Sequence, residues 1–303
     1  FSALRSLVKE IRNHKIDLLL LMQSKDIFLA AFAKIFSRPL ALVYYQQMDT
    51  RFMKRDFFHT WAYSKLSHWF TLTTMMKQNV LDSTRVNAEK ISVLPLGIDL
   101  ERFNPALFKK NESRKYFGIP QNKIIIGLLG RLDKGKGQQI LLEAVPSIIK
   151  KFPETFFIIA GEETAGESGF KKYLLERAQS LKIEQHLQFL PFTEEVPRFL
   201  SALDIFVMPS FAETFGLVLI EAMAMGLPVV STKAGGVPDI VEEGRTGLLV
   251  PPGDAGQLSS AILKIVSDKK FAGQLGTEAR TKALRRYNFN DCVDALLALM
   301  QKL

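Results

Sequence analysis

Three short segments combine residue types that suit an anionic, hydroxyl-rich ligand. The first follows an apolar run and contains Gly130, Arg131, Lys136 and Gly137. Glycine lets the backbone approach a ligand closely, and the N–H groups at the start of a helix favour an anion. Arginine and lysine both bind phosphate. The segment predicts a phosphate-binding turn, and a surface turn with solvated basic side chains is the alternative.

The second segment carries two carboxylates, Glu213 and Glu221, near the expected start of one helix. That helix begins near Gly216 and is apolar on every side, which indicates burial. Carboxylate oxygens accept hydrogen bonds, so the pair suits ligand hydroxyl groups. The alternative is that Glu213 caps the helix and Glu221 pairs with a structural cation.

The third segment has two adjacent glycines, Gly235 and Gly236, after another apolar run. Free backbone N–H groups at a helix start can form a second anion site. Two glycines alone fit a plain tight turn equally well.

Parallel strands would bring these segments to one edge of a sheet. Short apolar runs alternate with longer amphipathic stretches, which is typical of βα units. In the second half the expected strands are residues 123–129, 155–160, 187–190, 205–208, 228–231 and 246–250; in the first half they are residues 16–22, 40–45, 69–74 and 91–95. Ligands of such sheets bind outside the carboxyl ends of the strands, where all three segments lie.

A length of 303 residues favours two domains. We expect a first domain over residues 1–105, a polar linker over 106–120 and a second domain over 121–286. Residues 287–303 are expected to form a helix that crosses back to the first domain.

Composition limits the compartment and the partners. The single cysteine, Cys292, excludes an internal disulfide and favours a cytoplasmic protein. The net charge of +9 favours anionic partners, but no nucleic-acid-binding signature is present, so nucleic acid is not expected. The four histidines are scattered and no metal site is expected. Residues 51–61 mix cations with aromatic side chains. They predict either a helix lying on anionic lipid at the inner face of the membrane or a helix that packs its aromatic side chains inward.

Residues 130–136 also fit the start of a Walker A motif, which would indicate a P-loop nucleoside triphosphatase. However, Gly137 stands where a serine or threonine would bind magnesium, and no later strand ends in a suitable aspartate. The triphosphatase is therefore the weaker alternative.

Taken in order, the three segments resemble the retaining glycosyltransferases of family 4. The matching pieces are residues 130–132 with 136–137, the E-x7-E pair, residues 235–239, and also residues 242–250 and 94–99. The resemblance implies an α/β protein of the GT-B fold, with two facing Rossmann-like, doubly wound parallel-sheet domains. It is specific in the second half and rests mainly on element order in the first.

The resemblance also implies an activity and roles for residues. A sugar would pass from a nucleoside diphosphate to an acceptor hydroxyl with retention, without a metal or other cofactor. Arg131 and Lys136, in the turn bounded by Gly130 and Gly137, would hold the donor diphosphate and stabilise its developing charge. Glu221 would accept hydrogen bonds from the ribose hydroxyls.

The donor sugar would be held by Glu213 and by backbone N–H groups of the residues that follow it: Thr214, Phe215 and Gly216. Gly235 and Gly236 would support the sugar or the diphosphate. The base would stack near Leu190. The acceptor would be a glycan or a lipid-linked molecule of cell-surface polysaccharide or lipopolysaccharide synthesis.

The chain departs from the family pattern at several points. Pro191 stands where members often have glycine, and Gln46, Gln47 and Met48 stand where many have histidine; Gln47 is the candidate replacement. A glycine-rich loop near the family's N-terminus is absent, so we expect the first domain to lack roughly two βα units of about 30 residues each. An inactive sugar-nucleotide-binding module and a hydrolytic or epimerising enzyme of the same fold remain alternatives.

Overall fold

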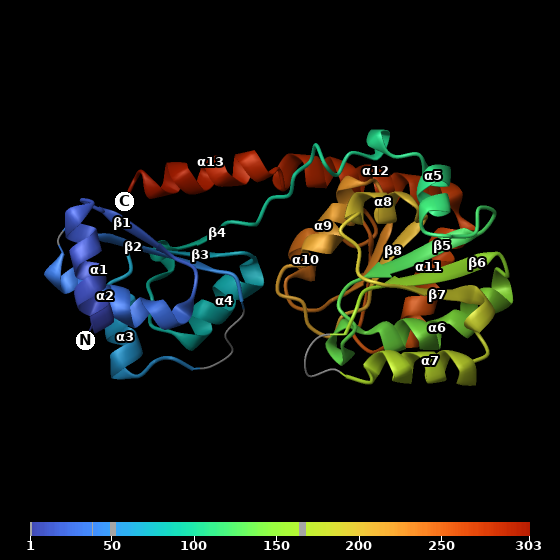
Figure 1. The fold of residues 1–303 in the computed structure, drawn as a ribbon, viewed down its shortest axis with the longest axis horizontal. Helices are drawn as coiled ribbons and strands as arrows, with labels where there is room; N and C mark the ends of the chain where they lie inside the picture. The colour runs from blue at the N-terminus through green and yellow to red at the C-terminus, as the bar shows by residue number, and fades with distance from the viewer. Residues whose placement is uncertain (1, 38, 49–52, 164–167) are drawn as a thin grey trace. The chain divides into compact units, whose positions relative to one another are not determined.

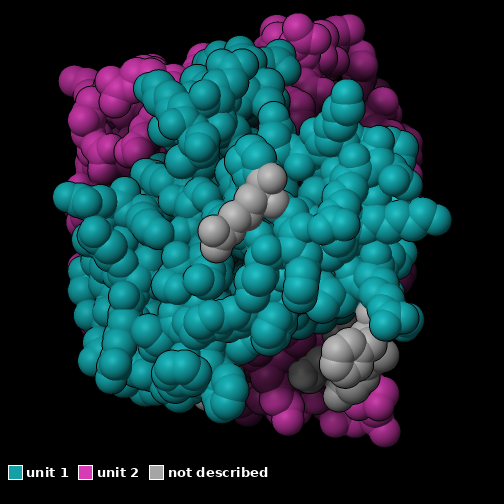
Figure 2. Space-filling view, turned by 90° about the vertical axis from the view of Figure 1, so that its left-hand side faces the viewer, with its two compact units in different colours: residues 1–96, 290–303 teal, residues 97–289 magenta. Residues whose placement is uncertain are grey.

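The computed structural model describes residues 2–37, 39–48, 53–163 and 168–303, and the chain divides into two compact units. Unit 1 comprises residues 1–96 and 290–303, and unit 2 comprises residues 97–289 (Figures 1 and 2). No helix among the described residues is long and apolar enough to span a membrane.

Unit 1 is built on a parallel sheet of four strands in the order β1-β2-β3-β4. The strands are β1 (Leu18–Leu21), β2 (Ala41–Gln46), β3 (His68–Thr71) and β4 (Ile91–Val93); the helices are α1 (Ser2–Asn13), α2 (Ile27–Phe36), α3 (Phe57–Ser64), α4 (Thr74–Ser83) and α13 (Phe289–Met300). Its core includes Ile27, Leu42 and Trp69. The strands are mainly apolar, as expected for parallel strands that are covered on both faces.

Unit 2 has a parallel sheet of six strands in the order β10-β9-β8-β5-β6-β7. The strands are β5 (Ile124–Leu129), β6 (Thr155–Ala160), β7 (Leu187–Leu190), β8 (Ile205–Met208), β9 (Val229–Thr232) and β10 (Leu248–Val250). The helices are α5 (Lys110–Tyr116), α6 (Gln138–Lys151), α7 (Phe170–Ser180), α8 (Val196–Ser201), α9 (Leu217–Ala224), α10 (Val237–Ile240), α11 (Ala255–Ser267) and α12 (Lys269–Arg286). Strand order reverses between β5 and β8, and ligands of such sheets usually bind at this switch point. The segments that carry residues 130–137 and 213–221 follow these two strands.

Every pair of neighbouring strands in the two sheets is parallel, which confirms the predicted α/β class with two parallel-sheet domains. The boundaries differ from the expected ones. Residues 106–120, expected to be a linker, lie in unit 2 and include α5. The chain passes between units at 96/97 and again at 289/290, so residues 290–303 return to unit 1. Within unit 2 the two crossing segments are paired: Ile98 N–H donates to the Tyr287 carbonyl at 2.8 Å.

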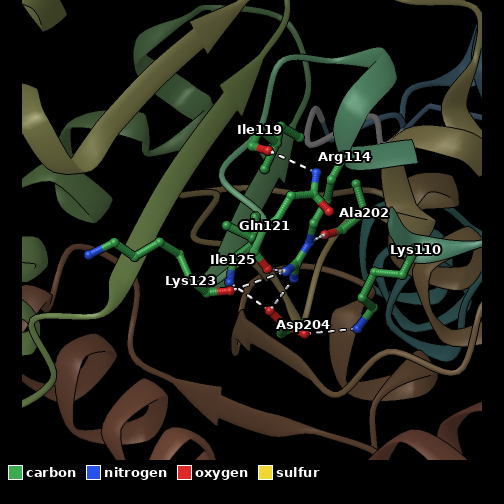
Figure 3. A network of polar contacts seen from close by, with 8 residues as sticks. All are labelled: Lys110, Arg114, Ile119, Gln121, Lys123, Ile125, Ala202 and Asp204. Carbon is green, nitrogen blue, oxygen red and sulfur yellow. Dashed lines mark hydrogen bonds and ion pairs between the residues drawn. The ribbon is translucent and has the colours of Figure 1, made fainter. Parts of the chain in front are cut away.

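Arg114 explains why the expected linker is structured (Figure 3). Its side chain is only 6% exposed. The guanidinium donates to the carbonyls of Ala202 at 2.9 Å and Gln121 at 2.8 Å, and to the Asp204 carboxylate at 2.7 Å. Asp204 in turn accepts from the Ile125 backbone N–H at 2.7 Å. One buried cation thus ties α5 and the start of β5 to the start of β8.

Replacing Arg114 by methionine should lower the free energy of unfolding by about 2–3 kcal/mol. Removal of one partner of a buried ion pair costs about 3–5 kcal/mol, and the 31% exposure of Asp204 reduces that penalty. Lys110→Met removes an exposed cation 2.8 Å from the same carboxylate and should cost less than about 1 kcal/mol. Urea unfolding followed by circular dichroism measures both, and equal losses would contradict the assignment.

Candidate functional site

A pocket of about 250 Å³ lies at the carboxyl edge of the unit 2 sheet. Its lining comes from the ends of β5 and β8, the two loops that follow them, and α9: Leu128, Leu129, Gly130, Arg131, Lys136, Met208, Ser210, Glu213, Val218 and Glu221. Both cations and both carboxylates that the sequence singled out therefore meet in one pocket, although they are spread over 91 positions of the chain.

The closest charged pair in this pocket joins Lys136 to Glu213. The Lys136 Nζ donates to the Glu213 Oε2 at 2.8 Å, and the two side chains are 24% and 15% exposed. Because the pair is largely shielded from water, its attraction is screened less than that of a surface pair. Lys136 is thus held inside the pocket, pointing at the loop that follows β8.

Arg131 lies at the pocket mouth. Its side chain is 64% exposed, and its guanidinium is 3.6 Å from the Asp133 carboxylate. Its backbone is fixed more firmly, since the carbonyl accepts from Gln138 Nε2 at 2.7 Å. An arginine with a fixed backbone and an exposed fork can reach an anion in the pocket without displacing a buried partner.

Two glycines allow the loops to pack main chain against main chain. Gly137 has a φ of +74°, and a Cβ there would lie 2.0 Å from the Pro209 carbonyl oxygen. Gly235 has a φ of +55°, and its Cβ would lie 1.9 Å from the Glu213 carbonyl oxygen. Any side chain at these positions would both strain the backbone and force the loops apart.

The Gly236 N–H differs from its expected state. The sequence suggested a free donor for an anion, whereas the structure shows it donating to the Glu213 carbonyl at 2.9 Å. Gly235 and Gly236 do not line the pocket among the described residues. In this structure they contact the site through Glu213, whose backbone they hold in place.

The start of α9 keeps its donors available. The backbone N–H groups of Thr214, Phe215 and Gly216 donate to no group within the described part of the chain. Gly216 caps the helix with a φ of +85° and offers no side-chain acceptor. Unsatisfied N–H groups and the positive end of the helix favour an electron-rich ligand group at this point.

Glu221 lies on the second turn of α9 and contributes the second carboxylate. Burial raises the pKa of Glu221 to about 7, and the positive charge of Arg102 opposes that rise. Desolvation has this effect because the charged form loses its hydration. The carboxyl group is therefore close to half protonated at neutral pH.

Sequence reasoning missed Arg102 and Ser210. Arg102 donates to the Glu194 carbonyl at 2.8 Å and influences Glu221. Ser210 lines the pocket, is fully buried, and its Oγ has no hydrogen-bond partner among the described residues. A Pro-Ser pair ending a strand was visible in the sequence, but no pattern could pair Arg102 with a residue 119 positions away.

Some predicted residues lie elsewhere. Leu190 ends β7 at the sheet edge, its carbonyl accepts from Gly161 N–H at 3.1 Å, and it is not among the described lining residues. Gln47 belongs to unit 1, where it is exposed just after β2. Arg51 and Phe52 lie outside the described residues. No group of three or more His, Cys, Asp or Glu in the described ranges could hold a metal ion.

Comparison with known families decides the assignment. The model of "Glycosyl transferases group 1" matches residues 109–282, and that of "Glycosyltransferase Family 4" matches residues 1–102. The chain belongs to the group 1, family 4 glycosyltransferases. The family resemblance inferred from its motifs is confirmed, as is the GT-B type of its two parallel-sheet domains.

Several relatives illustrate the family. A D-inositol 3-phosphate glycosyltransferase of Corynebacterium jeikeium is 34% identical over 232 residues, 75% of this chain and 55% of that protein. The Mycolicibacterium smegmatis protein of the same name is 31% identical over 228 residues, 75% of this chain and 50% of that protein. The chain thus spans about half the length of the curated relatives it matches.

Solved structures show the same fold. Anabaena Alr3699/HepE, solved in complex with UDP, superposes with a TM-score of 0.87 at 24% identity and covers 99% of this chain and 82% of its own. The C-terminal domain of a group 1 glycosyltransferase (LpcC) from Francisella tularensis is 31% identical, with a TM-score of 0.59. It covers 63% of this chain and 99% of its own.

The raised pKa of Glu221 predicts how stability depends on pH. The folded state holds this proton more tightly than the unfolded chain, so the stabilisation is complete below pH 4.5 and is lost as pH rises through about 7. At about 1.4 kcal/mol per pKa unit, the wild type should lose about 2–3 kcal/mol relative to Glu221→Gln between pH 5 and 8. Urea unfolding at each pH measures this.

Glu176→Gln provides the control, because that side chain is 64% exposed. Its stability should follow the wild type at every pH. Parallel curves for the wild type and Glu221→Gln would show that Glu221 is ionised throughout and would contradict the prediction.

Proposed function

We propose that the protein transfers a sugar from a nucleoside-diphosphate sugar to an acceptor hydroxyl, with retention of configuration. The carrying observation is the unit 2 pocket, where Arg131 and Lys136 face two carboxylates at the switch point of the sheet. Cations suit a diphosphate and carboxylates suit sugar hydroxyls. Membership in the glycosyltransferase family supports this activity.

The diphosphate is assigned to Lys136, Arg131 and the turn that begins at Gly130. A Cβ at Gly130 would meet nothing within 4 Å, so space is open beside the turn. Negative charge grows on the diphosphate as the glycosidic bond breaks, and fixed cations lower the barrier. We propose that these two side chains supply the charge that a metal ion would otherwise provide. Removal of one such group typically reduces the rate about 10²–10³-fold.

The sugar is assigned to Glu213 and the N–H groups of Thr214–Gly216. A diphosphate brings negative charge to Lys136, which weakens the attraction between Lys136 and Glu213. The Glu213 carboxylate, whose Oε2 lies 2.8 Å from the Lys136 Nζ, then becomes available to sugar hydroxyls. Glu221 is assigned to the ribose hydroxyls, which donate best to its ionised form. The base is placed near Leu190, beyond the described pocket lining.

Donor and acceptor identities extend the proposal. UDP is the nucleotide bound by the structurally similar Anabaena protein, so UDP-sugars head the candidate donors. For the acceptor we propose a glycan or lipid-linked hydroxyl in cell-surface polysaccharide or lipopolysaccharide assembly. The relatives named for D-inositol 3-phosphate make a phosphorylated cyclitol the competing acceptor.

Peripheral contact with an anionic membrane is a further part of the proposal. Two exposed aromatics begin α3, Phe57 at 77% and Phe58 at 69% exposure, close to Lys54 and Arg55. Trp61 on the same helix packs inward instead, with its ring 4.7 Å from that of Phe32. The inward-packing alternative thus describes Trp61, while the two phenylalanines remain available to lipid.

Nucleotide binding tests the donor site. In chelator, one nucleoside diphosphate should stabilise the protein by about 2.7 kcal/mol at 100 times its dissociation constant, and Arg131→Ala should abolish most of the shift. Arg245→Ala is the matched control, because its side chain is 67% exposed in the same unit and the substitution removes the same charge. Thermal shift with UDP, GDP, ADP and their sugars measures the effect.

Other outcomes separate the alternatives. Stabilisation only by a triphosphate with magnesium would indicate a P-loop protein. No shift with any nucleotide on a folded protein would indicate an inactive module. Release of free sugar or formation of an epimer, without transfer to an acceptor, would indicate a hydrolase or epimerase.

Liposome flotation tests the membrane contact. Phe57→Ser with Phe58→Ser should reduce binding to vesicles of phosphatidylglycerol and phosphatidylcholine by about tenfold or more, because two exposed rings no longer enter the interface. Lys54→Gln with Arg55→Gln should weaken binding only when anionic lipid is present. Unchanged flotation of both double variants would exclude this surface.

A further inference from the structure

A second pocket lies across the amino edge of the unit 1 sheet. Its volume is about 1090 Å³, and its lining includes Leu18 and Ala41, the first residues of β1 and β2, and Lys90, which directly precedes β4. Ligands of doubly wound sheets bind outside the carboxyl ends of the strands, and Gln47 follows that end of β2. This pocket therefore occupies the edge opposite to the expected substrate contacts of unit 1.

Three lysines from separate elements converge in this pocket: Lys34 on α2, Lys65 after α3 and Lys90 before β4. The Lys34 Nζ donates to the Lys65 carbonyl at 3.0 Å, and the Lys90 Nζ donates to the Leu66 carbonyl at 2.9 Å. Both ammonium groups are thus anchored to the same short segment, at the carbonyls of two adjacent residues.

The balance of charge in the pocket favours an anion. All three lysines are partly buried, and the exposed Asp17 is the single acidic residue among the described lining residues. The Lys34 Nζ also donates to the Ser67 Oγ at 3.5 Å, and an ammonium group keeps its positive charge when its N–H groups bind neutral carbonyl or hydroxyl oxygens. Like charges held together in a partly desolvated hollow repel one another, so a multiply charged anion lowers the free energy of this arrangement. Three cations match a phosphate dianion better than a single carboxylate.

Much of the remaining lining is apolar. Leu18, Pro39 and Ala41 lie along the sheet edge with part of their surface exposed, and Leu297 and Met300 come from α13. An inorganic ion would leave this surface in contact with water. A molecule with an apolar chain would cover it and gain about 25 cal/mol for each Å² buried.

We propose that this pocket binds the phosphate group of an amphiphilic molecule, such as a phosphorylated lipid, at a site separate from the donor pocket. The lysines neutralise the phosphate, and the leucines with Met300 cover the adjoining apolar chain. The assignment stands on unit 1 alone and does not depend on the activity proposed for unit 2.

Intrinsic fluorescence can report on this pocket selectively. The two tryptophans of the chain, Trp61 and Trp69, both belong to unit 1. The Lys65 Nζ lies 5.9 Å from the Trp61 ring centroid. A ligand that engages Lys65 should therefore change the Trp61 emission, whereas no tryptophan belongs to the unit that holds the donor pocket.

Titration of the full chain with dodecyl phosphate, below its micelle concentration, should give a saturable change in emission. Lys34→Gln with Lys90→Gln should weaken the apparent affinity at least tenfold, because glutamine keeps a donor for the carbonyls but removes the charge. Lys150→Gln with Lys151→Gln, at the exposed end of α6, makes the same charge change and should leave the affinity unaltered. Nucleotide thermal shifts should persist in both double variants.

Two further ligands decide the source of the phosphate. Inorganic phosphate should bind at least tenfold more weakly than dodecyl phosphate. Equal affinity would overturn the proposal of an amphiphilic ligand and would assign the pocket to free phosphate. An equal response to dodecyl maltoside, or no saturable response, would overturn the site. If the double lysine variant does not fold, Lys65→Gln provides the same comparison, and an unchanged affinity in that variant would also overturn the proposal.

Discussion

Contact between backbone and backbone at the carboxyl edge of the unit 2 sheet is the constraint on which the donor pocket depends. Gly137 lies against Pro209, and Gly235 lies against Glu213, each with no room for a Cβ. Glu213 is therefore fixed at two points, its carbonyl by the Gly236 N–H and its carboxylate by Lys136. A binding group supported in this way needs little reorganisation when a ligand arrives.

The same pocket holds two carboxylates in different electrostatic surroundings. Glu213 has an ammonium group at 2.8 Å, whereas the partial burial of Glu221 raises its pKa to about 7 against the lowering effect of the Arg102 charge. Two chemically similar side chains on one helix start are thereby prepared for different parts of one ligand. Burial and charge separate their roles, in the way that environment separates paired carboxyl groups elsewhere.

The sequence predicted the scaffold well because parallel strands covered on both faces must be apolar. All ten expected strands are present, with ends shifted by a few residues. The motifs at residues 130–137 and 213–221 also meet, since strand ends share an edge. Residues 106–120, expected to form a linker, are instead part of unit 2. Their polar composition was misleading because Arg114 is buried and donates to Asp204, 90 positions away. The contacts of Arg102 and Gly236 likewise depend on tertiary proximity, which no local pattern encodes.

Unit 2 is inserted into unit 1 in the order of the chain, and this has a consequence for synthesis on the ribosome. The 193 residues from 97 to 289 must be translated before residues 290–303 can join the unit that residues 1–96 begin. At about 5–20 residues per second, that interval is roughly 10–40 s. During that interval the surface of unit 1 that binds its last helix stays uncovered. Unit 2, in contrast, has its whole sequence in one stretch. Unit 2 can therefore complete its fold first, although it starts later.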